Sequence, residues 1–424
     1  MKRDFYYRDD TLFAEDVPLT EIASRVGTPV YVYSKRHFVE RFQSIDRAFK
    51  NQPHMVCFAL KANNNPGVLK LFAGQGAGAD VVSAGELAMA LAAGIPPQKI
   101  VFAGVGKRND EIEFALEKNI LAFNVESEQE LEVINDIAVQ MQRKAPVNIR
   151  VNPDIDPQSH PYISTGMAKN KFGIPIEKSY TVFEKAAALP GIRLLGVHSH
   201  IGSQILSVDA FVESARSLRR LVEDLRRKGI VLEIIDIGGG LGVDYKQVID
   251  EPPYEPLEVA VPPTPEELTN AVLAQLSDLG CKIIFEPGRF LTANGGILLT
   301  RVLYRKETSL KKFAIVDAGM NDLIRPSLYQ AYHRIVPVRK REKRDVISLD
   351  IVGPICESGD FFARDRLLPE VQRGDLLAIL SAGAYGYTLS SNYNGRPRIP
   401  EVLVDAASFT VVRKRETIDD LIGT

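Results

Sequence analysis

Short apolar runs alternate with longer segments of helical periodicity from residue 55 onward. The segments between the runs place apolar residues three and four positions apart, as amphipathic helices do. Strands buried on both faces read as near-continuous apolar stretches, so the pattern predicts parallel strands joined by helices. The runs cover residues 55–61, 79–83, 100–104, 121–125, 147–152, 194–200, 233–240 and 282–289.

Eight strand–helix units predict an α/β fold of the (β/α)8 TIM-barrel type. Polar residues gather at the carboxyl ends of the runs, where such barrels build their active sites. An open, doubly wound sheet is the alternative. Two long connections, residues 154–173 and the proline-rich 251–265, are interpreted as elaborated barrel loops.

The periodicity changes after about residue 295, where alternating strand patterns are separated by Gly and Pro turns. This change predicts a second, all-β domain of roughly 130 residues. The strand-like segments are residues 295–306, 311–319, 346–354, 374–386 and 401–414.

Composition excludes several classes of protein. The chain has 424 residues with 52 Lys plus Arg against 54 Asp plus Glu, so no polyelectrolyte field attracts nucleic acid or a membrane surface. Three scattered cysteines, Cys57, Cys281 and Cys356, are too few for a disulfide framework and fit a reducing compartment. Neither a signal peptide nor a long apolar span is evident, so we expect a cytoplasmic protein.

Several residue types with chemical potential lie at the predicted strand ends. Lys61 ends the first run, Gly238, Gly239 and Gly240 end the seventh, and Glu286 ends the eighth. Alone, each has an ordinary explanation as a solvated lysine, a tight turn or a rim salt bridge. His198 and His200 share a face and could ligate a metal, but no third ligand with familiar spacing accompanies them, so no metal is predicted.

Together these residues favour pyridoxal 5'-phosphate as a cofactor. That cofactor needs a lysine amine for a Schiff base, a phosphate cradle, and a carboxylate that keeps its ring nitrogen protonated. Consecutive glycines let backbone N–H groups approach a phosphate closely. Each part is present at the same end of the predicted strands.

The chain resembles the fold-type III pyridoxal-phosphate decarboxylases over nearly its whole length, and within them the diaminopimelate decarboxylase family. The motifs that carry the resemblance, in order, are FALKAN around Lys61, HSHIGSQ with His200 and Ser203, GGG at 238–240, EPGR with Glu286 and Arg289, RPSLY with Arg325 and Tyr329, CESGD with Cys356 and Glu357, and AGAYG with Tyr385.

The resemblance implies an alanine racemase-like architecture. A pyridoxal-phosphate-binding barrel would span residues 36–292, and residues 1–35 with 293–424 would form a β-domain that contributes substrate and dimer contacts. Lys61 would form the Schiff base, His200 would stack on the pyridine ring, and Glu286 would pair with its nitrogen. Further cofactor contacts are implied for Asp80, Ser203, Gly238, Gly239, Gly240, Gly288, Arg289 and Tyr385.

The resemblance also implies a substrate and a reaction. Diaminopimelate carries a whole amino-acid head at its far end, which needs a cation for the carboxylate and an anion for the ammonium. Arg289 and Arg325 would bind the carboxylate with Tyr329 and Tyr385, and Glu357 would bind the ammonium. Loss of CO₂ from meso-2,6-diaminopimelate, followed by protonation with Cys356 as the candidate donor, would yield L-lysine.

The family pattern further implies a homodimer in which the CESGD segment completes the partner's active site. His198 is expected to support the cofactor wall and Arg150 to lie near it, while the remaining histidines, His37, His54, His160 and His333, are interpreted as structural.

Three alternatives stay open at this stage. One is a related decarboxylase acting on a D-amino acid, ornithine, arginine or carboxynorspermidine. Another is a noncatalytic regulator of the same descent, and the third is a barrel enzyme for a nucleotide or a sugar phosphate. The two arginines, together with Lys61 and Glu286, argue against all three.

Overall fold

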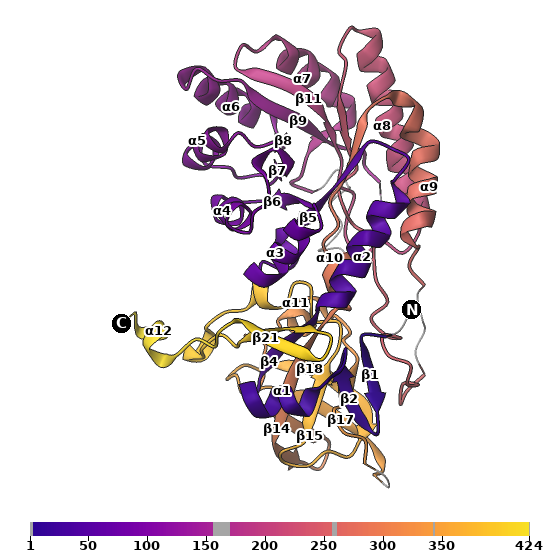
Figure 1. Cartoon of the computed structure of the whole chain (residues 1–424), viewed down its shortest axis with the longest axis vertical. Coiled ribbons are helices and arrows are strands. Elements are labelled where there is room, and N and C mark those ends of the chain that lie inside the picture. Colours follow the sequence, from indigo (N-terminus) through magenta and orange to yellow (C-terminus); the bar gives the residue numbers. More distant parts are fainter. Residues whose placement is uncertain (1–2, 156–169, 257–260, 342–343, 424) are drawn as a thin grey trace.

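The computed structural model describes residues 3–155, 170–256, 261–341 and 344–423. Much of the two long connections, including His160, therefore lies outside the described residues. Figure 1 shows a barrel with its outer helices in the upper half of the molecule and a β-rich domain below it. The chain passes from the β-rich domain into the barrel at about residue 35 and returns to the β-rich domain at about residue 295.

Eight parallel strands form a closed barrel, which confirms the predicted TIM-type fold and excludes the open sheet. The barrel closes because β8 pairs with β9 while β13 pairs with β5, all in parallel register. Each predicted apolar run overlaps one of these strands. The strands are β5 (His54–Ala59), β6 (Gly78–Val81), β7 (Ile100–Phe102), β8 (Ala122–Val125), β9 (Ala145–Asn152), β11 (Ile192–His198), β12 (Ile234–Asp236) and β13 (Lys282–Phe285), with the short β10 (Ile174–Pro175) beside β9.

Helices surround the barrel and bury one apolar face each. In α8, buried Leu218, Leu221 and Leu225 recur three and four positions apart and face the strands. Ser83 and Ser127 begin two of the helices by accepting the N–H of the third helical residue. The helices are α2 (Lys35–Ala48), α3 (Pro66–Gly74), α4 (Ala84–Ala92), α5 (Asn109–Lys118), α6 (Glu128–Gln140), α7 (Ile176–Ala188), α8 (Asp209–Arg227) and α9 (Pro265–Leu276).

The second domain is built on a mixed sheet. The strand β4 (Val30–Ser34), from the N-terminal part of the chain, lies between β14 and β20, so both ends of the sequence contribute to this domain. Its other strands are β14 (Gly296–Glu307), β15 (Lys312–Val316), β16 (Ile335–Pro337), β17 (Val346–Val352), β18 (Phe361–Pro369), β19 (Leu376–Ile379), β20 (Glu401–Asp405) and β21 (Ser408–Arg413). A small sheet of β1 (Phe5–Arg8), β2 (Thr11–Ala14) and β3 (Val17–Pro18), followed by α1 (Leu19–Val26), packs beside it.

Two strands of this domain that follow residue 295, β16 and β18, were absent from the sequence-based series. The β16 segment has only three residues, which is too short for an alternating pattern to emerge. In β18, a register shift in its pairing with β17 and a positive φ at Asp365 interrupt the alternation of buried and exposed positions.

Short elements at the junction of the two domains carry several predicted site residues. The turn η1 (Leu60–Ala62) holds Lys61, and the helices α10 (Arg289–Thr292) and α11 (Arg325–Tyr329) begin at the two arginines. The amide of Tyr385 donates to the carbonyl of Ala62 at 2.8 Å, which ties the β-domain to the Lys61 turn. The described helices, which end with α12 (Ile418–Ile422), include none that is long and apolar enough to cross a membrane.

Candidate active site

Lys61 projects from the turn that follows β5, and its ammonium lies against Asp80 on the neighbouring strand β6. The Nζ atom donates to Asp80 Oδ2 at 2.6 Å, and Asp80 is fully buried. Burial opposes the charge of Lys61, but Asp80 and Glu286 outweigh it and raise the pKa of the ammonium. Burial and the Glu286 carboxylate raise the pKa of Asp80 to about 6. The barrel mouth thus carries a lysine beside a perturbed carboxyl group.

Glu286 lies at the end of β13 inside a buried polar cluster. Its carboxylate contacts His198 Nε2 at 3.2 Å and accepts from the side-chain amide of Asn124 at 3.2 Å. Burial alone would raise the pKa of Glu286, yet His198 and Lys61 lower it, whereas burial and Glu286 raise the pKa of Asp236 well above its usual range. The pair therefore favours a single negative charge, on Glu286 rather than on Asp236.

Three side chains of this cluster are close enough to share a metal ion, because ligand atoms of His198, Asp236 and Glu286 lie within 4.8 Å of one another. No other such group occurs among the described residues. This grouping differs from the pair of His198 and His200 that the sequence suggested. The imidazole of His200 instead lies at the triglycine turn. Absence of a metal stays a prediction.

Two of the three amides of the triglycine turn after β12 bond to neighbouring side chains, and the phosphate cradle that the sequence suggested stays a prediction. The amide of Gly238 donates to Asp236 Oδ1 at 2.9 Å, and that of Gly239 donates to His200 Nδ1 at 3.1 Å. At most the Gly240 amide is thus left for an anion. Sterics explain the glycines, because a Cβ on Gly239 would lie 2.1 Å from the carbonyl oxygen of Glu286.

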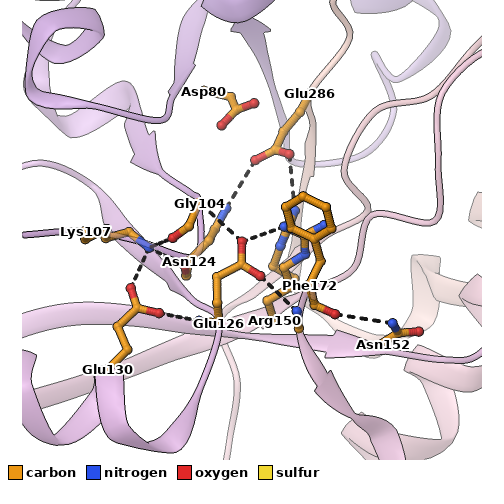
Figure 2. A network of polar contacts seen from close by, with 12 residues as sticks. Asp80, Gly104, Lys107, Asn124, Glu126, Glu130, Arg150, Asn152, Phe172 and Glu286 are labelled. Carbon is orange, nitrogen blue, oxygen red and sulfur yellow. Dashed lines mark hydrogen bonds and ion pairs between the residues drawn. The ribbon is translucent and has the colours of Figure 1, made fainter. Parts of the chain in front are cut away.

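A second buried network braces the neighbouring strand ends (Figure 2). Arg150 donates to Glu126 at 2.6 Å, and the other carboxylate oxygen of Glu126 accepts the amide of Gly173 at 2.9 Å. Lys107 donates to Glu130 at 2.6 Å and to two carbonyl oxygens. Arg150 therefore supports the wall of the site, and together with burial its charge lowers the pKa of His200.

Two buried arginines meet in a cavity at the domain junction. Arg289 and Arg325 are each 6% exposed. They line a cavity of about 310 Å³. A second cavity, of about 420 Å³, lies elsewhere in the β-domain and is lined by neither arginine. Arg289 donates to Ser203 Oγ at 3.0 Å and to the Tyr245 hydroxyl at 2.6 Å. Tyr329 also lines this cavity. Among the residues that the structure describes, no carboxylate pairs with either arginine.

Cys356 and Glu357 lie in the loop between β17 and β18. Cys356 is exposed, its amide donates to Asn394 Oδ1 at 2.8 Å, and Glu357 accepts the amide of Gly359 at 3.2 Å. Within the described part of the chain, no hydrogen bond or ion pair joins either residue to Lys61.

Comparison with known proteins decides the family. Residues 35–293 match the family described as pyridoxal-dependent decarboxylase, pyridoxal binding domain. The diaminopimelate decarboxylases of Aquifex aeolicus and Pseudomonas aeruginosa are each 50% identical to this chain, over 98% of it and over 96% and 97% of their own lengths. The chain belongs to the diaminopimelate decarboxylase family.

A solved diaminopimelate decarboxylase from M. jannaschii, in complex with L-lysine, has the same fold. It superimposes with a TM-score of 0.91 at 38% identity, covering 99% of this chain and 96% of that one. The barrel of the diaminopimelate decarboxylase family is a pyridoxal-binding domain, so pyridoxal phosphate is the cofactor.

The site fits that cofactor on its own geometry. Three buried polar atoms at the barrel end have no hydrogen-bond partner among the described residues: Asp80 Oδ1, His198 Nδ1 and Asp236 Oδ2. A Cβ on Gly288 would meet the Cβ of Ala62 at 2.9 Å and the Tyr385 hydroxyl at 3.5 Å, so glycine keeps this edge of the site open. Lys61 supplies the amine between these two regions.

Two residues at the arginines escaped the sequence analysis. Tyr245 was not predicted as a site residue, because a tyrosine after a glycine-rich turn does not by itself indicate a binding role. His333 was interpreted as structural, but it is fully buried and contacts Arg325, with Arg325 Nη1 donating to its Nε2 at 2.9 Å. A histidine eight positions after the RPSLY arginine was the available signal.

Proposed function

We propose that this chain decarboxylates meso-2,6-diaminopimelate to L-lysine and CO₂ with pyridoxal phosphate. The observation that carries the proposal is the pair of buried arginines, Arg289 and Arg325, without a carboxylate partner among the described residues. Buried cations are costly unless an anion compensates them. A substrate with a carboxylate at its far end supplies that anion, whereas a plain diamine precursor does not.

The cofactor-binding residues are assigned by position in the barrel. Lys61 would hold the cofactor covalently, His200 would cover one face of its ring, and Ser203 with Gly240 and Tyr385 would hold its phosphate. The ring, when bound, accepts the electron pair that the departing carboxylate leaves behind. Asp80, Gly238, Gly239 and Gly288 would shape the pocket around it.

Glu286 would hold a proton on the ring nitrogen. Its pKa, which His198 and Lys61 lower, supports a carboxylate at that point, while the pKa of the neighbouring Asp236 is raised. An arginine in this position could not accept that hydrogen bond. A carboxylate therefore favours decarboxylation, which requires the strongest electron withdrawal by the ring.

The substrate's distal head group would be bound by both signs of charge. Arg289 and Arg325 would bind the distal carboxylate, assisted by the hydroxyls of Tyr329 and Tyr385, and Glu357 would bind the distal ammonium. Cys356 would donate the proton that replaces CO₂.

We further propose that the chain acts as a homodimer in which Cys356 and Glu357 serve the partner's site. Cys356 is exposed, and in the described chain no hydrogen bond or ion pair joins it or Glu357 to Lys61, which supports this arrangement. Asp360 fixes the loop they occupy, because its carboxylate accepts the amides of Met320 and Ile355 at 2.6 Å each.

Product analysis tests the proposed activity. Purified protein loaded with pyridoxal phosphate is incubated with meso-diaminopimelate and, separately, with L-ornithine, D-ornithine, D-lysine, L-arginine and carboxynorspermidine, while CO₂ and amines are measured. We expect lysine from diaminopimelate alone, and no turnover by Lys61→Ala. Turnover of a substrate without a distal carboxylate, with diaminopimelate inert, would overturn the assignment.

A further inference from the structure

Tyr245 lies between the two buried arginines. Its hydroxyl accepts from Arg289 Nη1 at 2.6 Å, and the guanidinium carbon of Arg325 lies 4.9 Å from the centre of its ring. Burial raises the pKa of Tyr245, but the two guanidiniums outweigh it and lower that pKa below its ordinary value. Both positive charges therefore act on one phenol oxygen and its ring.

His333 fixes Arg325 from the other side. The carbonyl of Leu380 lies 2.8 Å from His333 Nδ1 and requires a proton there, which leaves the lone pair of Nε2 to accept from Arg325. Burial and the charge of Arg325 lower the pKa of His333 to about 3, so the imidazole stays neutral. Its ring meets that of Tyr245 edge-on, with centroids 5.5 Å apart.

These contacts orient both guanidiniums without a carboxylate. Arginines held by Asp or Glu would present a neutral pair to the cavity and lose their attraction for an anion. An imidazole and a phenol satisfy several N–H donors while leaving the positive charge of Arg325 and Arg289 uncompensated. The unused N–H donors and the charge both remain for a ligand.

We propose that Tyr245 and His333 are positioning residues that hold Arg289 and Arg325 as a carboxylate-binding pair and thereby set specificity for a substrate with a distal carboxylate. This inference rests on the proposed function. It adds two residues to the site and assigns them to selection of the substrate, since neither is placed at the reacting carbon.

The test compares ligands that differ only in the distal carboxylate. L-lysine retains that carboxylate and pentane-1,5-diamine lacks it, so both serve as competitive inhibitors of diaminopimelate turnover. For Tyr245→Phe we expect a KM for diaminopimelate and an inhibition constant for L-lysine each raised about tenfold, with kcat within about twofold, because uniform binding is lost. Inhibition by pentane-1,5-diamine and affinity for pyridoxal phosphate should not change.

Variants at His333 separate positioning from folding. His333→Leu removes the acceptor for Arg325 and should raise the same two constants, while His333→Gln supplies an amide oxygen to Arg325 and should restore most of the loss. If His333→Leu does not fold, Tyr245→Phe and His333→Gln still decide the question. Tyr180→Phe is the control, since it removes a hydroxyl that bonds Asp224 at 2.9 Å on the outside of the barrel.

The inference fails if Tyr245→Phe leaves both constants at the wild-type values, or weakens L-lysine and pentane-1,5-diamine equally. It also fails if the variant chiefly lowers the affinity for pyridoxal phosphate, because Tyr245 would then act through the phosphate site. Wild-type protein that does not decarboxylate diaminopimelate would instead overturn the proposed function.

Discussion

Single buried ionisable residues determine the charge state of the site. The pKa of Glu286 is lowered because His198 and Lys61 lie near it, whereas burial and Glu286 raise the pKa of Asp236. His333 stays neutral for a different reason, since burial and the adjacent Arg325 both oppose a second positive charge. The surroundings of each residue therefore determine which side chains accept a hydrogen bond and which attract an anion.

Removal of the Glu286 charge should slow the reaction more than it disturbs the fold. Glu286→Gln keeps the size of the side chain but cannot hold a proton on the ring nitrogen as a carboxylate does, so we expect kcat to fall roughly a hundredfold. Initial rates of CO₂ release measure it. Glu117→Gln, at an exposed position on α5, is the matched control. A rate within threefold of wild type would remove Glu286 from its assigned role.

The neutral state of His333 predicts a pH dependence of stability. Between a folded pKa of about 3 and the ordinary value of 6.5, the unfolded chain binds more protons than the folded one, so stability is lost as pH falls through this range. The contribution is about 1 kcal/mol per pH unit. Thermal unfolding at pH 7.5 and 5.5 should therefore show a larger loss for wild type than for His333→Gln, and equal losses would contradict the prediction.

At the scale of elements, the site depends on how closely the ends of adjacent strands approach. The turn after β12 meets the end of β13 where Gly239 lies against the backbone of Glu286, so the position of Glu286 depends on a residue without a side chain. The turn after β5 is tied to the β-domain by a backbone hydrogen bond from Tyr385 to Ala62. Element ends thus hold the reactive groups in register.

Gly239→Ala should separate these two strand ends. Its Cβ would lie 2.1 Å from a backbone carbonyl oxygen that no side-chain rotation can move, so we expect a loss of about 3 kcal/mol in stability. A lowered thermal midpoint and weaker binding of pyridoxal phosphate measure it. Gly106→Ala is the control, because nothing lies within 4 Å of the added methyl group. Similar midpoints for the two variants would rule out this steric role.

At the scale of the whole molecule, the residues proposed for the reaction form two sets, and in the described chain no hydrogen bond or ion pair joins Lys61 to Cys356 or Glu357. Lys61 and the arginines lie at the junction of barrel and β-domain, whereas Cys356 and Glu357 lie on a loop of the β-domain and contact their own surroundings. The proposed homodimer brings the two sets together. A two-fold interface does so twice, giving two composite sites.

Mixing two inactive variants tests these composite sites. In dimers that exchange subunits freely, an equimolar mixture of Lys61→Ala and Cys356→Ala should recover about a quarter of wild-type activity, because half of the dimers are mixed and each contains one intact site. Each variant alone, incubated in the same way, gives the baseline. Activity in the mixture no higher than the mean of the two baselines would show that Cys356 serves its own chain.

The sequence alone determined the barrel, the cofactor and the family. The periodicity of strands and helices is a local property of the sequence, and the motifs follow one another in a fixed order along the chain. Periodicity and motif order can therefore both be recognised from the sequence alone. Each of the eight predicted runs overlaps a barrel strand. The short β16 and the irregular β18 escaped because their patterns are set by their neighbours in the sheet rather than by their own residues.

Tertiary structure alone decided which side chains meet. Arg289 and Tyr245 are 44 positions apart, and the donors of the triglycine turn are taken up by Asp236 and His200, which no spacing rule indicates. Burial then sets the charge of each group, as His333 illustrates. These features depend on distance and desolvation in three dimensions, and a linear pattern of residue types contains neither quantity.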